Sequence, residues 1–104
     1  MITKFEQFSG IINVNIDGNV LYFKLKYDEN KFPFEIDLHI KNGKYDSLSV
    51  TIPDSNDLGN KEFFLNPEIN KNIVRSLEKE NFIQETGKES IAGDKPTKSY
   101  ILLI

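Results

Sequence analysis

The fold is decided by the stretch INVNIDGNVLYFKLKY, residues 12–27, in which apolar and polar side chains alternate on both sides of a turn. This period of two is typical of β-strands with one buried face. A two-residue turn at Gly18-Asn19 places Ile16 opposite Leu21, and the sequence therefore predicts a hairpin with one apolar side. The residues of that side are Ile12, Val14, Ile16, Leu21, Phe23, Leu25 and Tyr27.

The same alternation extends to a third strand, residues 34–40, whose apolar positions are Phe34, Ile36, Leu38 and Ile40. If Leu25 pairs with Ile36, two pairs of opposite charges face each other on the polar side. A pair of this kind stabilises a sheet by about 0.2–1 kcal/mol. The predicted charged pairs are Lys26–Glu35 and Lys24–Asp37.

A fourth strand, residues 48–52, follows the turn residues Lys41–Lys44. A two-residue turn would mix the apolar and polar faces of the two strands. A three-residue loop, Lys41–Gly43, with Gly43 at positive φ instead places Leu48 opposite Ile36. The first half of the chain therefore predicts an antiparallel meander.

The second half begins with a loop, Pro53–Asn60, and a short strand, Glu62–Leu65. Asn66 and Pro67 are typical of the start of a helix, which we expect over residues 67–80. Its buried stripe is Ile69, Ile73 and Leu77, at i, i+4 and i+8. Asn81 suits the position just after the helix.

The remaining residues predict further strands. Phe82–Glu85 forms one, Thr86–Lys88 forms a turn or bulge, and the apolar terminal strand Ser99–Ile104 docks in the core. Residues 1–10 suit either a helical turn or an irregular strand. Residues 1–104 are thus expected to form a single α+β domain, an antiparallel sheet of about six or seven strands with one helix on its apolar face.

Composition excludes several classes of function. The 104 residues contain thirteen basic and sixteen acidic side chains and no cysteine, with a net charge of −3. This balance argues against a strongly cationic nucleic-acid binder, and the lack of cysteine excludes thiol chemistry and disulfides. No apolar stretch is long enough to span a membrane, and no secretory signal is expected, so we expect a cytoplasmic protein.

No catalytic or cofactor motif stands out. His39 is the single histidine, and its place on the polar side of the third strand favours a structural role. Asp54 and Asp57 share one loop, but a calcium site needs a denser run of oxygen ligands. An enzyme would require these three side chains around one pocket, which the alternation disfavours. We expect no enzyme activity, no cofactor and no metal.

Two sets of side chains are candidates for contacting a partner. Outward-facing Tyr22, Tyr27 and Tyr45 are of the type that anchors protein interfaces, and the acids Asp54, Asp57 and Glu62 accompany them. A basic stripe on the helix could instead grip phosphates or an acidic surface, although glutamates on the same helix dilute it. Its residues are Lys71, Arg75 and Lys79.

Residues 45–104 resemble a small domain-of-unknown-function family carried by plasmids, conjugative elements and phages of Firmicutes and gut bacteria. The resemblance lies in Leu48–Asp54, Glu62–Leu65, Leu77-Glu78, Thr86–Lys88, Gly93 and the apolar terminal strand. It implies mobile-element cargo, a class in which small proteins often inhibit host defences, CRISPR nucleases included.

The leading hypothesis is therefore a non-enzymatic domain that binds a host or phage protein, as an anti-CRISPR-like inhibitor. The polar face of the sheet and the loop Pro53–Asn60 are its expected contact surfaces. The alternative is a weak nucleic-acid-binding accessory protein that uses the basic stripe.

Overall fold

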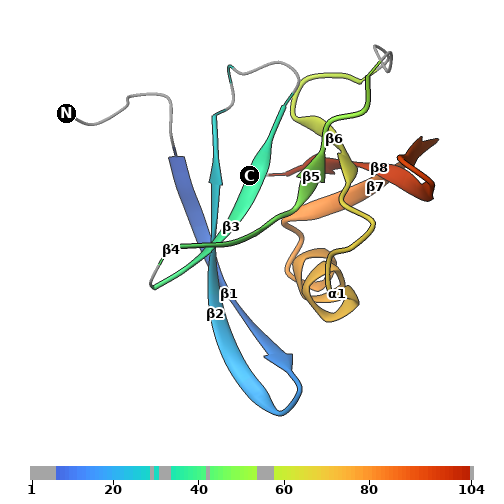
Figure 1. Ribbon diagram of the computed structural model, residues 1–104. Coiled ribbons are helices and arrows are strands. Elements are labelled where there is room, and N and C mark those ends of the chain that lie inside the picture. The colour runs from blue at the N-terminus through green and yellow to red at the C-terminus, as the bar shows by residue number, and fades with distance from the viewer. Residues whose placement is uncertain (1–6, 29, 31–33, 42, 54–57, 104) are drawn as a thin grey trace.

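The computed structural model describes residues 7–28, 30, 34–41, 43–53 and 58–103, with side chains from residue 12 onward. These residues form eight strands and one helix, α1 (Lys71–Lys79). The strands are β1 (Gln7–Ile16), β2 (Asn19–Tyr27), β3 (Ile36–Ile40), β4 (Gly43–Ser47), β5 (Ser49–Val50), β6 (Glu62–Leu65), β7 (Ile83–Ala92) and β8 (Lys95–Leu102). The α+β class, the antiparallel strands and the packed helix are confirmed, but the strands divide into two sheets (Figure 1).

The two sheets differ in topology. In the first sheet, strands β1, β2, β3 and β4 are neighbours in sequence order, as the predicted meander requires. In the second sheet the order is β5-β6-β8-β7, and all pairs are antiparallel. The last strand, β8, is therefore central, which confirms that the apolar terminal strand docks in the core, although it begins at Lys95 rather than Ser99.

The first hairpin turns one residue earlier than predicted. Ile16 pairs with Asn19, so the turn residues are Asp17 and Gly18, with φ of 52° and 84°. Positive φ at both positions defines the type I′ turn that Asp-Gly favours, because its twist matches that of the strands. The Gly18 N–H also donates to Asn15 Oδ1 at 3.1 Å. Ile16 thus pairs with Asn19 instead of Leu21, a shift of two residues. Because an even shift keeps each side chain on its face of the sheet, the apolar face is the predicted one.

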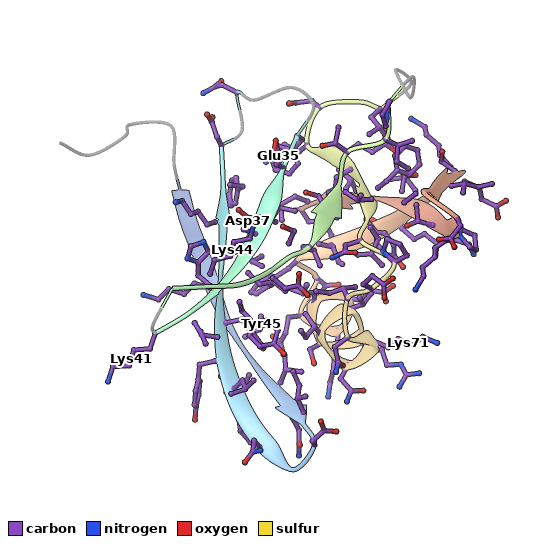
Figure 2. The ribbon with its side chains drawn as sticks, in the orientation of Figure 1. Glu35, Asp37, Lys41, Lys44, Tyr45 and Lys71 are labelled. Atoms are coloured by element: carbon purple, nitrogen blue, oxygen red, sulfur yellow. The ribbon has the colours of Figure 1, made fainter. Side chains whose placement is uncertain are left out.

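The register between β2 and β3 also differs from the prediction by two residues. Leu25 pairs with Leu38, and Lys26 pairs with Asp37 rather than Glu35. Lys24 lies opposite His39 and not opposite Asp37. A second cation approaches the same carboxylate from the next strand, since Lys44 Nζ lies 3.6 Å from Asp37 Oδ1 (Figure 2). Asp37 therefore still faces basic side chains, but the predicted pairs Lys26–Glu35 and Lys24–Asp37 are wrong.

The β3–β4 hairpin contains the expected extra residue in a different place. Ile40 pairs directly with Gly43, and the register shifts between Leu38 and His39, which places the bulge inside the strands. Gly43 has the predicted positive φ, at 129°. Leu48 still lies beside Ile36, whose carbonyl accepts its N–H at 2.9 Å. The alternation of apolar and polar residues required one extra residue between the two strands but did not determine its position.

The chain passes from the first sheet to the second at Ser47–Ser49, so the predicted strand 48–52 is not continuous with the meander. Leu48 is fully buried, and its carbonyl accepts the Asn66 N–H at 2.8 Å. Ser49 Oγ accepts the Ile36 N–H at 3.0 Å, and the Asn66 side-chain amide donates to the Ser47 carbonyl at 2.9 Å. We call Ser47, Leu48 and Ser49 the junction, because their hydrogen bonds join the two sheets.

One buried cluster contains side chains from both sheets and from α1. Four aromatic rings run through it in series, from Tyr27 to Phe34, Phe63 and Tyr100, with centroid separations of 5.9, 6.2 and 6.4 Å. Such pairs contribute about 0.5–1.5 kcal/mol beyond the area they bury. The helix adds Ile69 of its preceding turn and its own residues Ile73, Val74 and Leu77.

The helix is shorter at its start than predicted. Asn66 forms a turn in which its Oδ1 accepts the Glu68 N–H at 3.0 Å, and α1 begins after a second asparagine, Asn70. The Asn70 side chain accepts the Asn72 N–H at 2.8 Å, as an N-cap does. Both asparagines suit a cap, and the helix uses the later one, with Ile69 buried in the turn between them.

Asn81 lies just after the end of the helix, as predicted, and has φ of 60°. The Asn81 N–H donates to the Glu78 carbonyl at 3.0 Å, and the Phe82 N–H donates to the Leu77 carbonyl at 2.9 Å. This pair of bonds is the Schellman motif, in which the left-handed residue is usually glycine.

Replacing Asn81 should therefore reveal the strain of this conformation. We expect Asn81→Ala to lower the free energy of unfolding by about 1 kcal/mol and Asn81→Gly to raise it by a few tenths to about 1 kcal/mol. Urea unfolding followed by circular dichroism measures both values. Glu80→Ala, at the neighbouring residue with φ of −85°, should change stability by less than about 0.5 kcal/mol. Equal effects of alanine and glycine at position 81 would contradict the assignment.

Candidate functional site

The three tyrosines predicted to anchor a partner do not share a surface. Tyr22 is 62% exposed on the outward side of β2, as expected. Tyr27 is 6% exposed and belongs to the core cluster. This burial confirms the apolar side that the alternation gave Tyr27 and shows that its choice as an outward-facing anchor is wrong. Tyr45 is 40% exposed, but its ring packs edge-on against core residue Phe23 at 4.8 Å between centroids (Figure 2). Tyr22 is thus the one fully exposed ring of the three.

Tyr45 departs from the alternation because it belongs to the bulge of β4. The register passes from His39–Lys44 to Leu38–Asp46, which leaves Tyr45 as the unpaired residue. A bulge turns its side chain away from the position that strict alternation gives it. The ring therefore covers Phe23 on the core side, opposite to the side that carries Tyr22.

Tyr22 has an exposed apolar neighbour on the same side of the first hairpin. Val20, two residues earlier on β2, is 54% exposed. Asn13 pairs with Tyr22 and Asn15 pairs with Val20, so two amide side chains lie beside the two apolar ones. We call Asn13, Asn15, Val20 and Tyr22 the hairpin face.

Of the three predicted acids, Glu62 alone is among the described residues. Asp54 and Asp57 lie outside the described residues, and with them half of the loop Pro53–Asn60 that was predicted as a contact surface. Glu62 is buried, although the sequence grouped it with these surface acids. His39 lies half-buried on β3 opposite Lys24. Among the described residues, no group of three or more His, Cys, Asp or Glu side chains could hold a metal ion.

Glu62 is the centre of a polar network that joins β6 to β7 and β8. Its Oε1 accepts the Gly59 N–H and Lys88 Nζ, each at 2.7 Å, and its Oε2 accepts the Thr86 hydroxyl at 2.5 Å. The Thr86 hydroxyl also lies 2.5 Å from Ser99 Oγ, which accepts the Lys88 N–H at 2.9 Å. Thr86 and Lys88 occupy the predicted bulge of β7, where the register shifts between Glu85 and Glu89.

The network sets the charge of Glu62. Burial acts to raise the pKa of this carboxyl, but the hydrogen bonds from Gly59, Lys88 and Thr86 and the positive charge of Lys88 outweigh burial and lower the pKa. The carboxylate is therefore ionised in the folded protein at neutral pH and paired with Lys88. Every donor it uses comes from a turn or from the bulge, which indicates a structural role for the network.

The basic stripe of α1 is divided by the geometry of the helix. Lys71 and Arg75 line a depression of about 340 Å³ between α1 and β8, whereas Lys79 does not. Each i+4 step rotates the side chain by about 40°, so Lys79 points about 80° away from Lys71 around the axis. A third cation, Lys98 of β8, lines the opposite wall. We call this depression the α1–β8 groove.

The floor of the α1–β8 groove is apolar. Its described lining includes Pro67, Ile69 and Val74 on the helix side and Pro96 and Tyr100 on β8. Burial, with the charges of Glu78 and Glu85, raises the pKa of Tyr100, so its hydroxyl is protonated at neutral pH and able to donate a hydrogen bond. The helical spacing of Lys71 and Arg75 indicated a basic stripe, but no pattern in the sequence predicted that Lys98 and Tyr100 of β8 would line the same groove.

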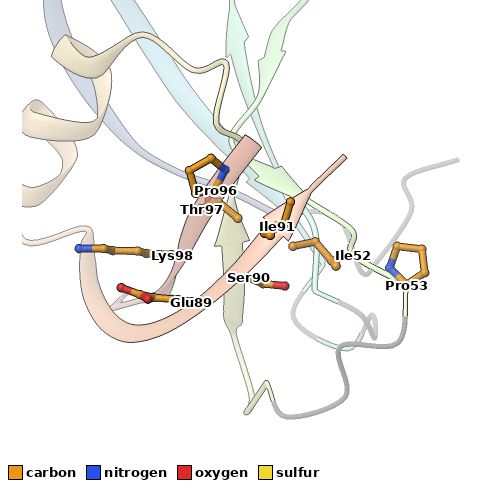
Figure 3. A pocket seen from close by; sticks show the side chains of 8 residues that line it. All are labelled: Ile52, Pro53, Glu89, Ser90, Ile91, Pro96, Thr97 and Lys98. Atoms are coloured by element: carbon orange, nitrogen blue, oxygen red, sulfur yellow. The ribbon is translucent and has the colours of Figure 1, made fainter. Parts of the chain in front are cut away.

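A larger, open depression of about 900 Å³ lies at the end of the β7–β8 hairpin (Figure 3). Ile52, Pro53 and Ile91 form its apolar side, and Glu89 and Lys98 lie at its rim. Pro53 immediately precedes residues 54–57, which are not described. The figure shows the hairpin strands curving around this depression, with Ile52 opposite Ile91.

Comparisons of the chain with protein-family models, with curated proteins and with solved structures gave no match. The resemblance of residues 45–104 to a mobile-element family therefore stays a prediction. Within the described part of the chain, no helix has the length and apolar character needed to cross a bilayer.

The Glu62 network predicts how stability depends on pH. Because the folded pKa of Glu62 lies below its unfolded value of about 4.3, its contribution is present above that pH and is lost as the pH falls through the folded pKa. Glu62→Gln should lower the free energy of unfolding at pH 7 by about 1.5–3 kcal/mol, the range for hydrogen bonds to a charged group. Denaturant unfolding at several pH values should show that the difference in unfolding free energy between the wild type and the variant becomes smaller between about pH 5 and pH 3.

The matched control is Glu85→Gln, because Glu85 is an exposed carboxylate that Lys98 Nζ approaches only to 4.0 Å. It should change stability by less than about 0.5 kcal/mol at every pH. A deficit for Glu62→Gln that stays constant down to pH 3 would show that the network does not hold the charged carboxylate.

Proposed function

We propose that this chain is a non-enzymatic protein-binding domain whose main contact surface is the hairpin face. The supporting observation is the exposure of Val20 and Tyr22 side by side on an outward sheet surface. Tyrosine at the centre of an interface is a frequent anchor, since it buries a large ring and keeps a hydroxyl for hydrogen bonding.

The arrangement of the hairpin face suits this role. Residues two apart on a strand lie about 7 Å apart, so Val20 and Tyr22 can enter one apolar hollow of a partner. Asn13 and Asn15 lie directly across the ladder and can donate and accept hydrogen bonds at the margin. Most of the inward side of the same hairpin is buried in the core, which holds the two exposed side chains in place.

The resemblance described above supplies the finer part of the proposal. The partner is a host or phage protein in the cytoplasm, and binding inhibits a host defence system. This part depends on the mobile-element resemblance alone, whereas the contact surface depends on the exposed side chains.

A binding experiment with matched variants tests the contact surface. Tagged protein is used to capture partners from a lysate of a Firmicutes host, and the affinity of the captured protein, once identified and purified, is measured by biolayer interferometry. Tyr22→Ala should weaken binding by about 30-fold or more, which corresponds to the 2 kcal/mol expected of an anchor.

Ile91→Ala is the control, because Ile91 is also 62% exposed but lies on β7. It should change the affinity by less than about threefold. Equal affinity of the Tyr22 variant and the wild type would contradict the hairpin face as the contact surface. A captured small molecule that the chain converts catalytically would contradict a non-enzymatic role.

A further inference from the structure

We propose that the α1–β8 groove binds an acidic, extended segment of a protein partner, with Lys71, Arg75 and Lys98 contacting its carboxylates. The proposal rests on the proposed function in so far as the ligand is a protein. It adds a second surface, on the helix rather than on the first hairpin, and it specifies the chemistry of the partner.

The charge of the groove favours an anionic ligand. Lys71 and Arg75 are exposed, and no ion pair joins either of them to another described residue. Lys98 is only loosely paired, with 4.0 Å between its Nζ and Glu85 Oε2. The neighbouring Lys95, by contrast, is bound to Glu68 and lies outside the groove. Three cations therefore face one opening, against the single carboxylate of Glu78 in its lining.

The walls of the groove are held in place by the fold. Val74 and Ile69 are buried and fix the helix side, and the Thr97 hydroxyl donates to the Leu65 carbonyl, which joins β8 to the end of β6. A rigid groove reduces the ordering cost of binding. Its volume of about 340 Å³ is large enough for a few side chains and too small for a folded domain.

The lining favours a peptide over a nucleic acid. The accessible apolar side chains Pro67 and Pro96 suit the aliphatic side chains of a peptide, whereas single-stranded nucleic acid needs exposed rings on which bases stack. Tyr100, the ring in the groove, is buried.

Fluorescence anisotropy with a defined probe tests the proposal on the full chain. The probe is a fluorescein-labelled eight-residue peptide in which Glu alternates with Leu. We expect saturable binding that weakens when salt is raised, and at least tenfold weaker binding of the same peptide with Gln in place of Glu. No saturable binding of the Glu peptide, or equal binding of the two peptides, would overturn the proposal.

The division of the basic stripe supplies a matched control. The double variant Lys71→Glu/Arg75→Glu should weaken binding of the Glu peptide at least tenfold, whereas Lys79→Glu on the same helix should change it by less than twofold. Lys71→Gln/Arg75→Gln, which introduces no new repulsion, should give an intermediate loss. Equal effects of Lys79→Glu and the double charge reversal would overturn the groove as the site.

Two further arms separate this proposal from its alternatives. A fluorescein-labelled single-stranded DNA of eight nucleotides should bind more weakly than the peptide. Tighter binding of the DNA would overturn the proposal and identify a nucleic acid as the ligand of the groove. Tyr22→Ala should leave peptide binding unchanged. If the groove variants bind the peptide normally while Tyr22→Ala loses the protein partner, the groove proposal fails and the proposed function stands.

Discussion

The structure depends on the short junction Ser47–Ser49, where one chain segment belongs to both sheets. The Leu48 N–H bonds to β3, its carbonyl bonds to Asn66 after β6, and Ser49 Oγ accepts the Ile36 N–H. Because these groups are buried, each would cost about 1–3 kcal/mol if it lost its partner. Separating the two sheets would therefore break these hydrogen bonds, and it would also break the aromatic series from Tyr27 to Tyr100, whose rings come from both sheets.

The sequence predicted faces more accurately than registers, for a physical reason. Alternation has a period of two, so it specifies which side of a strand is buried but permits any even shift of the pairing. Two predicted registers were wrong by two residues, at the Ile16–Asn19 turn and at Leu25–Leu38, and both preserved the buried face. Turn chemistry resolves such a choice, since Asp17-Gly18 accepts positive φ at both positions. The division into two sheets had no comparable local signal, because it depends on the hydrogen bonds of the junction.

The same contrast applies to the candidate surfaces. Tyr22 could be placed outward from alternation alone, and Asn81 could be placed at the end of the helix from its residue type. Tyr45 could not be placed, since an internal bulge turned it toward Phe23. By sequence alone Glu62 resembles a surface acid, but a donor from the preceding turn, Gly59, and two from the β7 bulge allow it to be buried and ionised. Only part of the α1–β8 groove could be predicted. Lys71 and Arg75 lie one helical turn apart in the sequence, whereas Lys98 comes near them only in the folded chain.

The bulge of β7 affects how the molecule behaves in a crowded solution. β7 is ten residues long and lies at the edge of the second sheet, where a straight strand would offer a continuous row of backbone donors and acceptors to another chain. The shift between Glu85 and Glu89 interrupts that row, and the Glu62 network fixes the interruption in place. The second sheet can thus keep a long edge strand without inviting the strand-to-strand aggregation that leads to amyloid.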